Sequence, residues 1–358
     1  MKPTRRTLLS MGCAFGAAAL LPWKGLAQSH SGPASPPPPQ DLLHFVNPEF
    51  RPALQQMLKT MGSMPDLNAS TLPLFRRMSS SWSPPLLPAP PVREQTIPGP
   101  KGPPEIHVYL CGDSPGASRP AVLHIHGGGY IAGTPSSNRR DLQQLVLDHE
   151  CVTLSVDYRL APEATFPHSL EDIYAALKWM NVNAKSLGID TTRIAVKGES
   201  AGGGHAAALA IVARDRHEFS LCLQVLIYPM LDDRTASTRQ LPSQFGAFVW
   251  TPASNRFGWS SLLGVPAGSA IVPRNAVPAR VTNLAGLPPA FIGVGSIDLF
   301  APEDIDYAQR LILAGIPTEL NVVPGGFHGF DGIAPDSSLA REFTHAWNEA
   351  LRRAFTTA

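Results

Sequence analysis

The sequence predicts an α/β fold in which a mostly parallel sheet carries helices on both faces. From about residue 92 onward, short apolar segments alternate with segments of helical periodicity, the pattern of strand–helix–strand units. A chain of 358 residues is also long enough for one large domain of this kind with a smaller appended segment. Strands are expected at residues 105–110, 121–126, 151–156, 193–197, 223–228, 290–295 and 319–323.

Two helices between these strands have marked ends. The sequence Ser-Leu-Glu-Asp at residues 169–172 resembles a capping box and predicts a helix start. A later helix is expected to begin at Pro302, with Glu303 and Asp304 in its first turn, and to end at Gly315.

The first 27 residues predict an export signal. Paired arginines at residues 5–6 precede a short, mildly apolar stretch at 12–21, and small residues at 25–27 offer a cleavage site. The arginines are typical of a bacterial twin-arginine signal; an ordinary secretory signal and, more weakly, a lipid anchor at Cys13 are the alternatives. The apolar stretch is short for a membrane span. We therefore expect a periplasmic or secreted protein whose mature form is not stably inserted in a membrane.

Proline dominates the chain between this signal and residue 92, and the whole chain contains 37 prolines. Residues 28–40 predict a proline-rich linker. Residues 41–91 contain one helix candidate, at about 48–61, and then proline-broken segments that cannot form a core of their own. This part is expected to form an N-terminal cap segment on a catalytic domain formed by residues 92–358.

The composition excludes several classes of partner. The net charge is +1, only 16% of residues are charged, and no basic tract lies beyond the extreme N-terminus, so nucleic-acid binding is not expected. The chain also lacks the glycine patterns that bind nucleotide phosphates. We expect neither a cofactor nor a metal. The oligomeric state is left open, a homodimer included.

Residues 198–203 read Gly-Glu-Ser-Ala-Gly-Gly and stand between a predicted strand and a helical stretch of small residues. A serine at a tight strand-to-helix turn is the layout of a nucleophile elbow, and glycines are needed two residues before and after it because side chains would clash there. A Gly-x-Ser-x-Gly match alone arises by chance in roughly one chain in ten of this size. Assigning Ser200 as a nucleophile therefore requires a base, an acid and an oxyanion hole.

Candidates for the acid and the base follow the last two predicted strands. Asp298 and then His328 come after Ser200 in the order serine, acid, histidine. Of the eleven histidines, His328 is the one in a glycine-rich loop after a late strand. Glu303 and Asp304 are alternative acids, but both fit better as helix N-terminal acids stabilised by the helix dipole.

Backbone donors for an oxyanion are predicted in two places. The sequence His-Gly-Gly-Gly at residues 126–129 follows a strand, so amide groups without bulky side chains can approach a developing alkoxide. The amide of Ala201, directly after the serine, offers a further donor.

The segment at residues 229–285 is longer than one crossover needs and is rich in aromatic residues. It can form part of a lid over an acyl pocket, or it can pack helices onto the sheet. The aromatic residues concerned are Phe245, Phe248, Trp250, Phe257 and Trp259.

Together these motifs resemble the hormone-sensitive-lipase-like bacterial esterases, which are α/β-hydrolases with an N-terminal helical cap. The resemblance covers about residues 95–355 and implies carboxylester hydrolysis with Ser200 as nucleophile, His328 as base and Asp298 as acid. It further implies that Gly128, Gly129 and Ala201 donate to the oxyanion, and that Asp157 and Arg159 brace the loop beneath the site. The matching motifs lie at residues 126–129, 157–163, 198–203, 286–290 and 328–330.

The expected function is hydrolysis of small, short-acyl esters through an acyl-enzyme. An amidase or formamidase would use the same residues. A non-catalytic ligand-binding protein on a hydrolase scaffold is the remaining alternative, and the presence of His328 argues against it.

Overall fold

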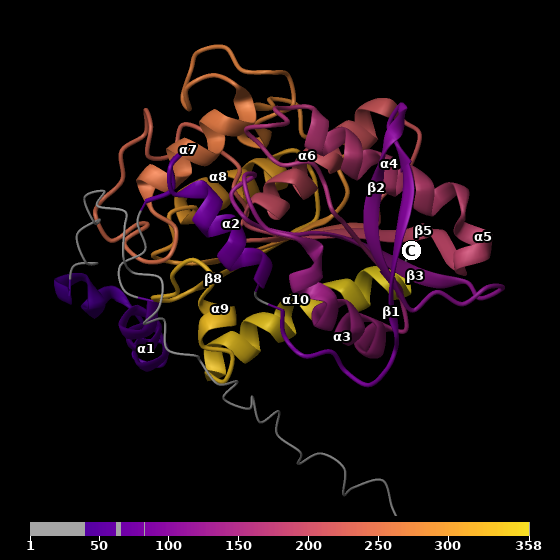
Figure 1. The fold of residues 1–358 in the computed structure, drawn as a ribbon, viewed down its shortest axis with the longest axis horizontal. Coiled ribbons are helices and arrows are strands. Elements are labelled where there is room, and N and C mark those ends of the chain that lie inside the picture. The colour runs from indigo at the N-terminus through magenta and orange to yellow at the C-terminus, as the bar shows by residue number, and fades with distance from the viewer. Residues whose placement is uncertain (1–39, 62–65, 82, 358) are drawn as a thin grey trace, which may run out of the picture. The chain divides into compact units, whose positions relative to one another are not determined.

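The computed structural model describes residues 40–61, 66–81 and 83–357, so the predicted signal and nearly all of the predicted linker lie outside the described residues. An eight-stranded sheet runs in the order β1-β2-β4-β3-β5-β6-β7-β8 (Figure 1). The pairs β1–β2 and β2–β4 are antiparallel, and all other neighbours are parallel. The strands are β1 (Val92–Gly99), β2 (Gly102–Cys111), β3 (Arg119–Ile125), β4 (Val152–Val156), β5 (Ile189–Glu199), β6 (Leu223–Ile227), β7 (Ala290–Gly295) and β8 (Thr318–Val323).

Helices cover both faces of this sheet, as the sequence predicts (Figure 1). Side chains of a strand point alternately to the two faces, so Ile194 and Val196 of β5 join one hydrophobic cluster and Ala195 joins the other. One face packs on α4 (His168–Val182), α6 (Ala201–Arg216) and α8 (Ala301–Leu313), and the other on α3 (Arg139–His149) and α10 (Ser338–Thr357). The predicted α/β class is therefore confirmed.

Strand β1 was not among the predicted strands. It lies at the edge of the sheet, and its residues 93–95 are partly or fully exposed while Ile97 is buried. An edge strand can carry polar side chains toward solvent, so it lacks the apolar run that reveals a central strand.

The N-terminal part contains η1 (Gln40–Phe45), α1 (Arg51–Met61) and α2 (Leu72–Ser81). The helix predicted at about 48–61 corresponds to α1. Helix α2 is not predicted and lies where the sequence indicates proline-broken segments; its Pro73 is in the first helical turn, where the missing N–H of proline is not needed.

Helix α4 corrects the predicted capping box. It begins at His168, and Ser169 lies inside its buried first turn without capping the helix. The carboxylate of Asp172 instead accepts hydrogen bonds from the backbone N–H and the guanidinium of Arg159, at 2.7–3.0 Å. Asp172 therefore pairs with Arg159 in a neighbouring loop, and it does not cap the start of α4.

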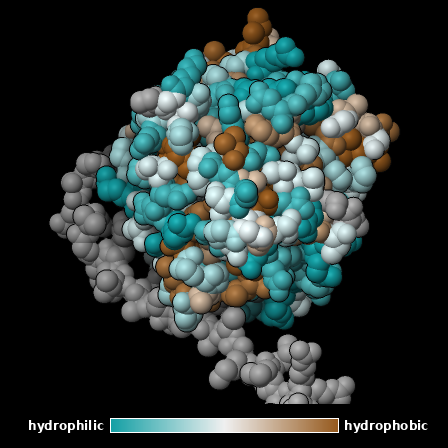
Figure 2. All heavy atoms as spheres, turned by 90° about the vertical axis from the view of Figure 1, so that its right-hand side faces the viewer, coloured by the Kyte–Doolittle hydropathy of each residue, from teal (hydrophilic) through white to brown (hydrophobic). Residues whose placement is uncertain are grey.

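The face at the right-hand side of Figure 1 shows hydrophobic residues in separate small groups among hydrophilic ones (Figure 2). In the ranges that the structure describes, no helix has both the length and the apolar character needed to cross a bilayer.

Candidate active site

Ser200 occupies a sharp turn between β5 and α6. Its backbone has φ 57° and ψ −121°, an unfavourable conformation for a residue with a side chain. Hydrogen bonds hold the turn: the N–H of Ser200 donates to Ile227 O at 2.9 Å, and Ser200 O accepts from the N–H groups of Gly204 and Met230. Hydrogen bonds to the end of β6, to the first turn of α6 and to Met230 therefore keep Ser200 in its strained conformation.

The glycines around this serine are required by close backbone contacts. A Cβ atom on Gly198 would lie 2.2 Å from Gly202 O, and one on Gly202 would lie 2.0 Å from Ile125 O. Both distances are far below van der Waals contact, so the turn closes only with glycine at these two positions. Both glycines of the motif are therefore explained by steric clash, as the sequence predicts.

Ser200, His328 and Asp298 form a continuous row of hydrogen bonds. The Ser200 hydroxyl lies 3.0 Å from His328 Nε2, and His328 Nδ1 lies 2.8 Å from Asp298 Oδ2. The other oxygen of Asp298 accepts from the N–H of Phe300 at 3.0 Å. Asp298 is fully buried, and the serine and histidine are each 7% exposed. The carboxylate therefore orients the imidazole so that Nε2 faces the hydroxyl.

Aromatic rings surround His328. Tyr228 and Phe300 meet it edge-on at centroid distances of 4.8 and 5.2 Å, and Trp250 lies at 6.4 Å. The hydroxyl of Tyr228 donates to Asp331 Oδ1 at 3.1 Å, which fixes the loop that carries the histidine. These rings limit the access of water and the rotation of the imidazole.

The glycine loop passes directly beside the serine. A Cβ atom on Gly127 would lie 3.4 Å from the Cβ of Ser200. Gly128 and Gly129 have φ 124° and 63°, values that favour glycine. Within the described residues, the N–H groups of Gly128, Gly129 and Ala201 donate no hydrogen bond to another backbone group. These three amides are available to an oxyanion.

Two buried histidines lie behind this loop in the neutral form. His126 donates from Nδ1 to Gly127 O at 2.8 Å and stacks on Tyr158 at 4.3 Å. Burial lowers the pKa of His126 to about 4 and that of His205, which lies edge-on to Tyr130 and Tyr158, to about 3. The imidazole of His126 thus shapes the loop without placing a charge near the oxyanion site.

The low pKa of His205 predicts a pH-dependent stability. Between the ordinary value of 6.5 and the folded value of about 3, the unfolded chain binds a proton that the folded protein does not. Lowering the pH in this window therefore favours unfolding, by about 1.4 kcal/mol per pH unit for this group. His205→Gln removes this contribution.

Urea denaturation of both proteins between pH 6 and pH 4 measures the effect. The free energy of unfolding of the wild type should fall relative to that of His205→Gln by about 1.4 kcal/mol per pH unit. A difference between the two proteins that stays constant with pH would contradict the assignment.

Beneath the serine, the half-buried Glu199 forms a charged cluster with the buried His124 and Lys197. Its Oε2 lies 3.0 Å from His124 Nε2, and its Oε1 pairs with Lys197. Burial alone would raise the pKa of Glu199, but the Lys197 ammonium and His124 outweigh burial and hold the pKa well below its usual range. Both oxygens of the Glu199 carboxylate are therefore already bound to neighbouring side chains of the fold.

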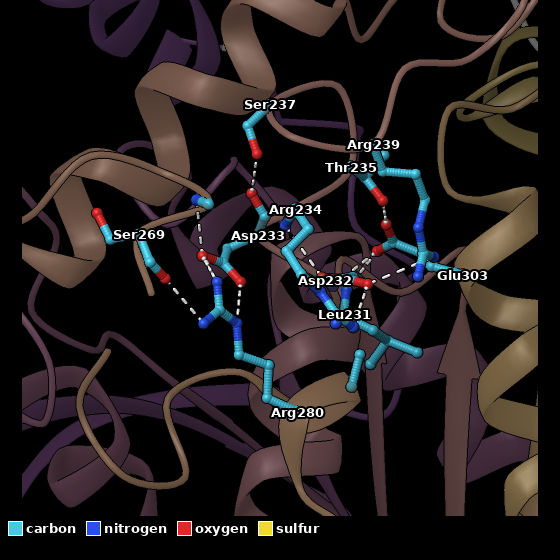
Figure 3. A network of polar contacts seen from close by, with 12 residues as sticks. Leu231, Asp232, Asp233, Arg234, Thr235, Ser237, Arg239, Ser269, Arg280 and Glu303 are labelled. Atoms are coloured by element: carbon cyan, nitrogen blue, oxygen red, sulfur yellow. Dashed lines mark hydrogen bonds and ion pairs between the residues drawn. The ribbon is translucent and has the colours of Figure 1, made fainter. Parts of the chain in front are cut away.

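The alternative acids, Glu303 and Asp304, do lie in the first turn of α8, but they are buried and do not contact His328. Glu303 accepts hydrogen bonds from the N–H groups of Leu231 and Asp232, at 2.7 and 3.0 Å, and from the Thr235 hydroxyl (Figure 3). It therefore ties the helix that follows Asp298 to the loop after β6.

Further ion pairs continue this network. Asp232 pairs with Arg234 and Arg239, and Asp233 pairs with Arg280 through both carboxylate oxygens, each contact being 2.7 Å (Figure 3). The sequence does not reveal this network because Arg280 and Glu303 are far along the chain from residues 231–239, which they contact.

Arg76 of α2 is a second feature that the sequence analysis missed. Its guanidinium donates to Ile131 O at 2.7 Å, to Ala161 O at 2.8 Å, and to both carboxylate oxygens of Glu163. It thereby joins the N-terminal part to the end of the glycine loop. Two of its acceptors are backbone carbonyls. Every residue has this group, so no residue type in the sequence indicates the contact.

Arg159 braces the loop after β4 through its ion pair with Asp172, whereas the side chain of Asp157 is exposed. No group of three or more His, Cys, Asp or Glu residues in the described ranges is arranged to hold a metal ion.

The sheet order, the strained strand–serine–helix turn and the histidine and acid after the last two strands define the α/β-hydrolase fold. Residues 122–332 match the family model for the alpha/beta hydrolase fold, and the chain belongs to this family. Its resemblance to the hormone-sensitive-lipase-like esterases is confirmed, and the protein is a serine carboxylic ester hydrolase.

Three known proteins illustrate the likeness. Esterase LipI of Mycobacterium tuberculosis is 34% identical over 267 residues, which are 73% of this chain and 81% of that protein. Ethyl acetate hydrolase of Pseudomonas putida is 33% identical over 230 residues, 61% of this chain and 68% of that protein. The solved structure of a bacterial heroin esterase has a TM-score of 0.77 and 32% identity, covering 87% of this chain and 99% of its own.

Proposed function

We propose that the protein hydrolyses small, short-acyl carboxylic esters through an acyl-enzyme formed on Ser200. The observation that carries the proposal is the buried row of hydrogen bonds from the Ser200 hydroxyl through His328 to Asp298, with distances of 3.0 and 2.8 Å. Nucleophile, base and orienting acid are within hydrogen-bond reach before any substrate binds.

In acylation, His328 Nε2 takes the hydroxyl proton as Ser200 Oγ attacks the acyl carbon. The carbonyl oxygen becomes an oxyanion facing the amides of Gly128, Gly129 and Ala201, and each such donor contributes about 3 kcal/mol to the transition state. The buried Asp298 carboxylate stabilises the imidazolium that forms. When the tetrahedral intermediate collapses, the imidazolium protonates the leaving alcohol.

Deacylation repeats these steps with water as the nucleophile. His328 takes a proton from water, the hydroxide oxygen attacks the acyl carbon, and the same amides hold the second oxyanion. Collapse breaks the bond to Ser200 Oγ, the imidazolium returns its proton to the serine, and the carboxylic acid leaves. No further group is needed to balance either half-reaction.

Two observations support the short-acyl preference. Ser200 and His328 are only 7% exposed and lie among aromatic rings, which limits the space next to the acyl carbon. The likeness to the ethyl acetate hydrolase of Pseudomonas putida adds support, since the name of that protein specifies a small ester.

A series of p-nitrophenyl esters from acetate to palmitate tests the proposal. The expected result is the highest kcat/KM at acetate to butyrate and a fall of at least about 100-fold at palmitate, because a small site gains little from added methylenes and must exclude long ones. Matched amides measured beside the esters should react more slowly. A maximum at long chains would overturn the short-acyl preference, and faster turnover of the amides would favour an amidase.

A further inference from the structure

The indole of Trp250 lies against the glycine loop. A Cβ atom added to Gly129 would be 2.2 Å from Trp250 Cη2, so the six-membered ring is in contact with the backbone of this glycine. The same indole lies 6.4 Å from the imidazole of His328, measured between ring centroids. Trp250 therefore borders both the oxyanion loop and the base, although it belongs to neither.

The indole is held in this position from several sides. Its Nε1–H donates to Asn255 Oδ1 at 3.3 Å, and the amide of the fully buried Asn255 donates to Thr235 O at 2.9 Å. The preceding residue, Val249, has φ 68°, a strained value for a β-branched residue that the surrounding structure must enforce. Only 6% of Trp250 is exposed. The ring cannot swing away from the loop without breaking these contacts.

Helix α7 (Pro252–Leu263) fixes the chain directly after the indole. Thr251 caps the helix by accepting from the N–H of Ser254 at 3.1 Å. The N-terminal part reinforces this end: Thr251 Oγ1 donates to Asp66 Oδ1 at 2.5 Å, and the N–H of Leu67 donates to Ser254 Oγ at 3.1 Å. The position of Trp250 is thus set jointly by α7 and by the segment before α2.

The chemistry of the tetrahedral intermediate indicates which part of a substrate the indole faces. Of the four bonds at the reacting carbon, one leads to Ser200 Oγ, one to the oxyanion at the glycine loop and one to the leaving oxygen, which must face His328 Nε2. The fourth leads to the acyl chain. The indole contacts the backbone of Gly129 with ring carbons, and its one polar atom is bonded to Asn255. It therefore presents an apolar surface beside the oxyanion loop, which suits the hydrocarbon acyl chain rather than the polar leaving oxygen.

We propose that Trp250 is the residue that sets the acyl-length limit, because its indole closes the acyl side of the site behind Gly129. The short, unbranched acyl groups of small esters then fit, and longer chains meet the ring. This inference rests on the ester hydrolysis proposed above.

Trp250→Leu and Trp250→Phe test the inference with p-nitrophenyl acetate, butyrate and octanoate. The ratio of kcat/KM for octanoate to that for acetate should rise about tenfold or more in Trp250→Leu and less in Trp250→Phe, in proportion to the ring volume removed. The matched control is Trp179→Leu on α4, a partly buried tryptophan packed against a different core cluster from the one that contains Trp250. Its ratio should equal that of the wild type.

The outcomes separate this inference from the proposed function. If the wild-type protein hydrolyses none of these esters, the proposed function itself is wrong. An active, short-acyl wild type whose octanoate-to-acetate ratio is unchanged in folded Trp250→Leu and Trp250→Phe overturns only the role of Trp250. A change confined to a series of alkyl acetates, in which only the alcohol varies, would place the indole on the leaving-group side and would also overturn it. Thermal melts establish folding, and Trp250→Phe preserves most of the packing if the leucine variant does not fold.

Discussion

Replacing Ser200 with alanine is expected to lower kcat for p-nitrophenyl acetate by about 10⁴- to 10⁶-fold, because alanine lacks the hydroxyl on which the proposed acyl-enzyme forms. The hydroxyl contacts His328, and the backbone of the turn is held by main-chain hydrogen bonds that alanine retains. The variant should therefore fold with an unchanged melting temperature.

A fluorophosphonate probe gives an independent measurement of the same prediction. The wild type should be labelled at Ser200, and Ser200→Ala should not be labelled. Full activity or undiminished labelling of the variant would show that another residue is the nucleophile.

Replacing Asp298 with asparagine is expected to lower kcat by about 10⁴-fold while keeping the shape of the site. The amide oxygen can still accept from the N–H of Phe300, but the amide N–H₂ group then faces His328 Nδ1. This forces the imidazole into the tautomer with its proton on Nε2, which cannot accept the serine proton. Steady-state rates with p-nitrophenyl acetate measure the loss.

The control for this variant is Asp304→Asn. Asp304 is as deeply buried as Asp298, but neither of its carboxyl oxygens has a hydrogen-bond partner in the described part of the chain, and burial raises its pKa well above the ordinary value. Asparagine keeps the shape of this side chain and breaks no hydrogen bond of the wild type, so activity should stay within a few-fold of the wild type. Equal losses in the two variants would contradict the assignment of Asp298 as the acid.

The sequence allows the position of the site to be predicted because parallel strands end at one edge of the sheet. Ser200, Asp298 and His328 each follow a strand whose apolar run is visible in the sequence, so the shared geometry of the strands brings them together. The glycines around Ser200 can also be predicted from the motif: Gly198 is required by a backbone contact within the turn and Gly202 by the close approach of β3.

The surroundings of the site could not be predicted in this way. Arg76 binds backbone carbonyls, and Asp172 matches a helix-cap pattern but pairs with Arg159. The aromatic segment left two interpretations open, and Trp250 takes part in both: it packs in a buried cluster and also lies at the site. These roles depend on contacts between segments that are far apart in the sequence. Local sequence patterns do not show which segments will meet.

The pairing of Asp233 with Arg280 gives the aromatic segment a defined boundary. The two ends of residues 234–279 meet at this one ion pair, whose carboxylate is fully buried, while β6 and β7 lie outside it. Helix α7 and Trp250 lie between these two points, and the contacts of Thr235 with Glu303 and of Thr251 with Asp66 anchor the segment further. The composition of this segment can therefore vary while the strands that carry Ser200 and Asp298 stay unchanged, provided that Asp233, Arg280 and these anchoring contacts are kept.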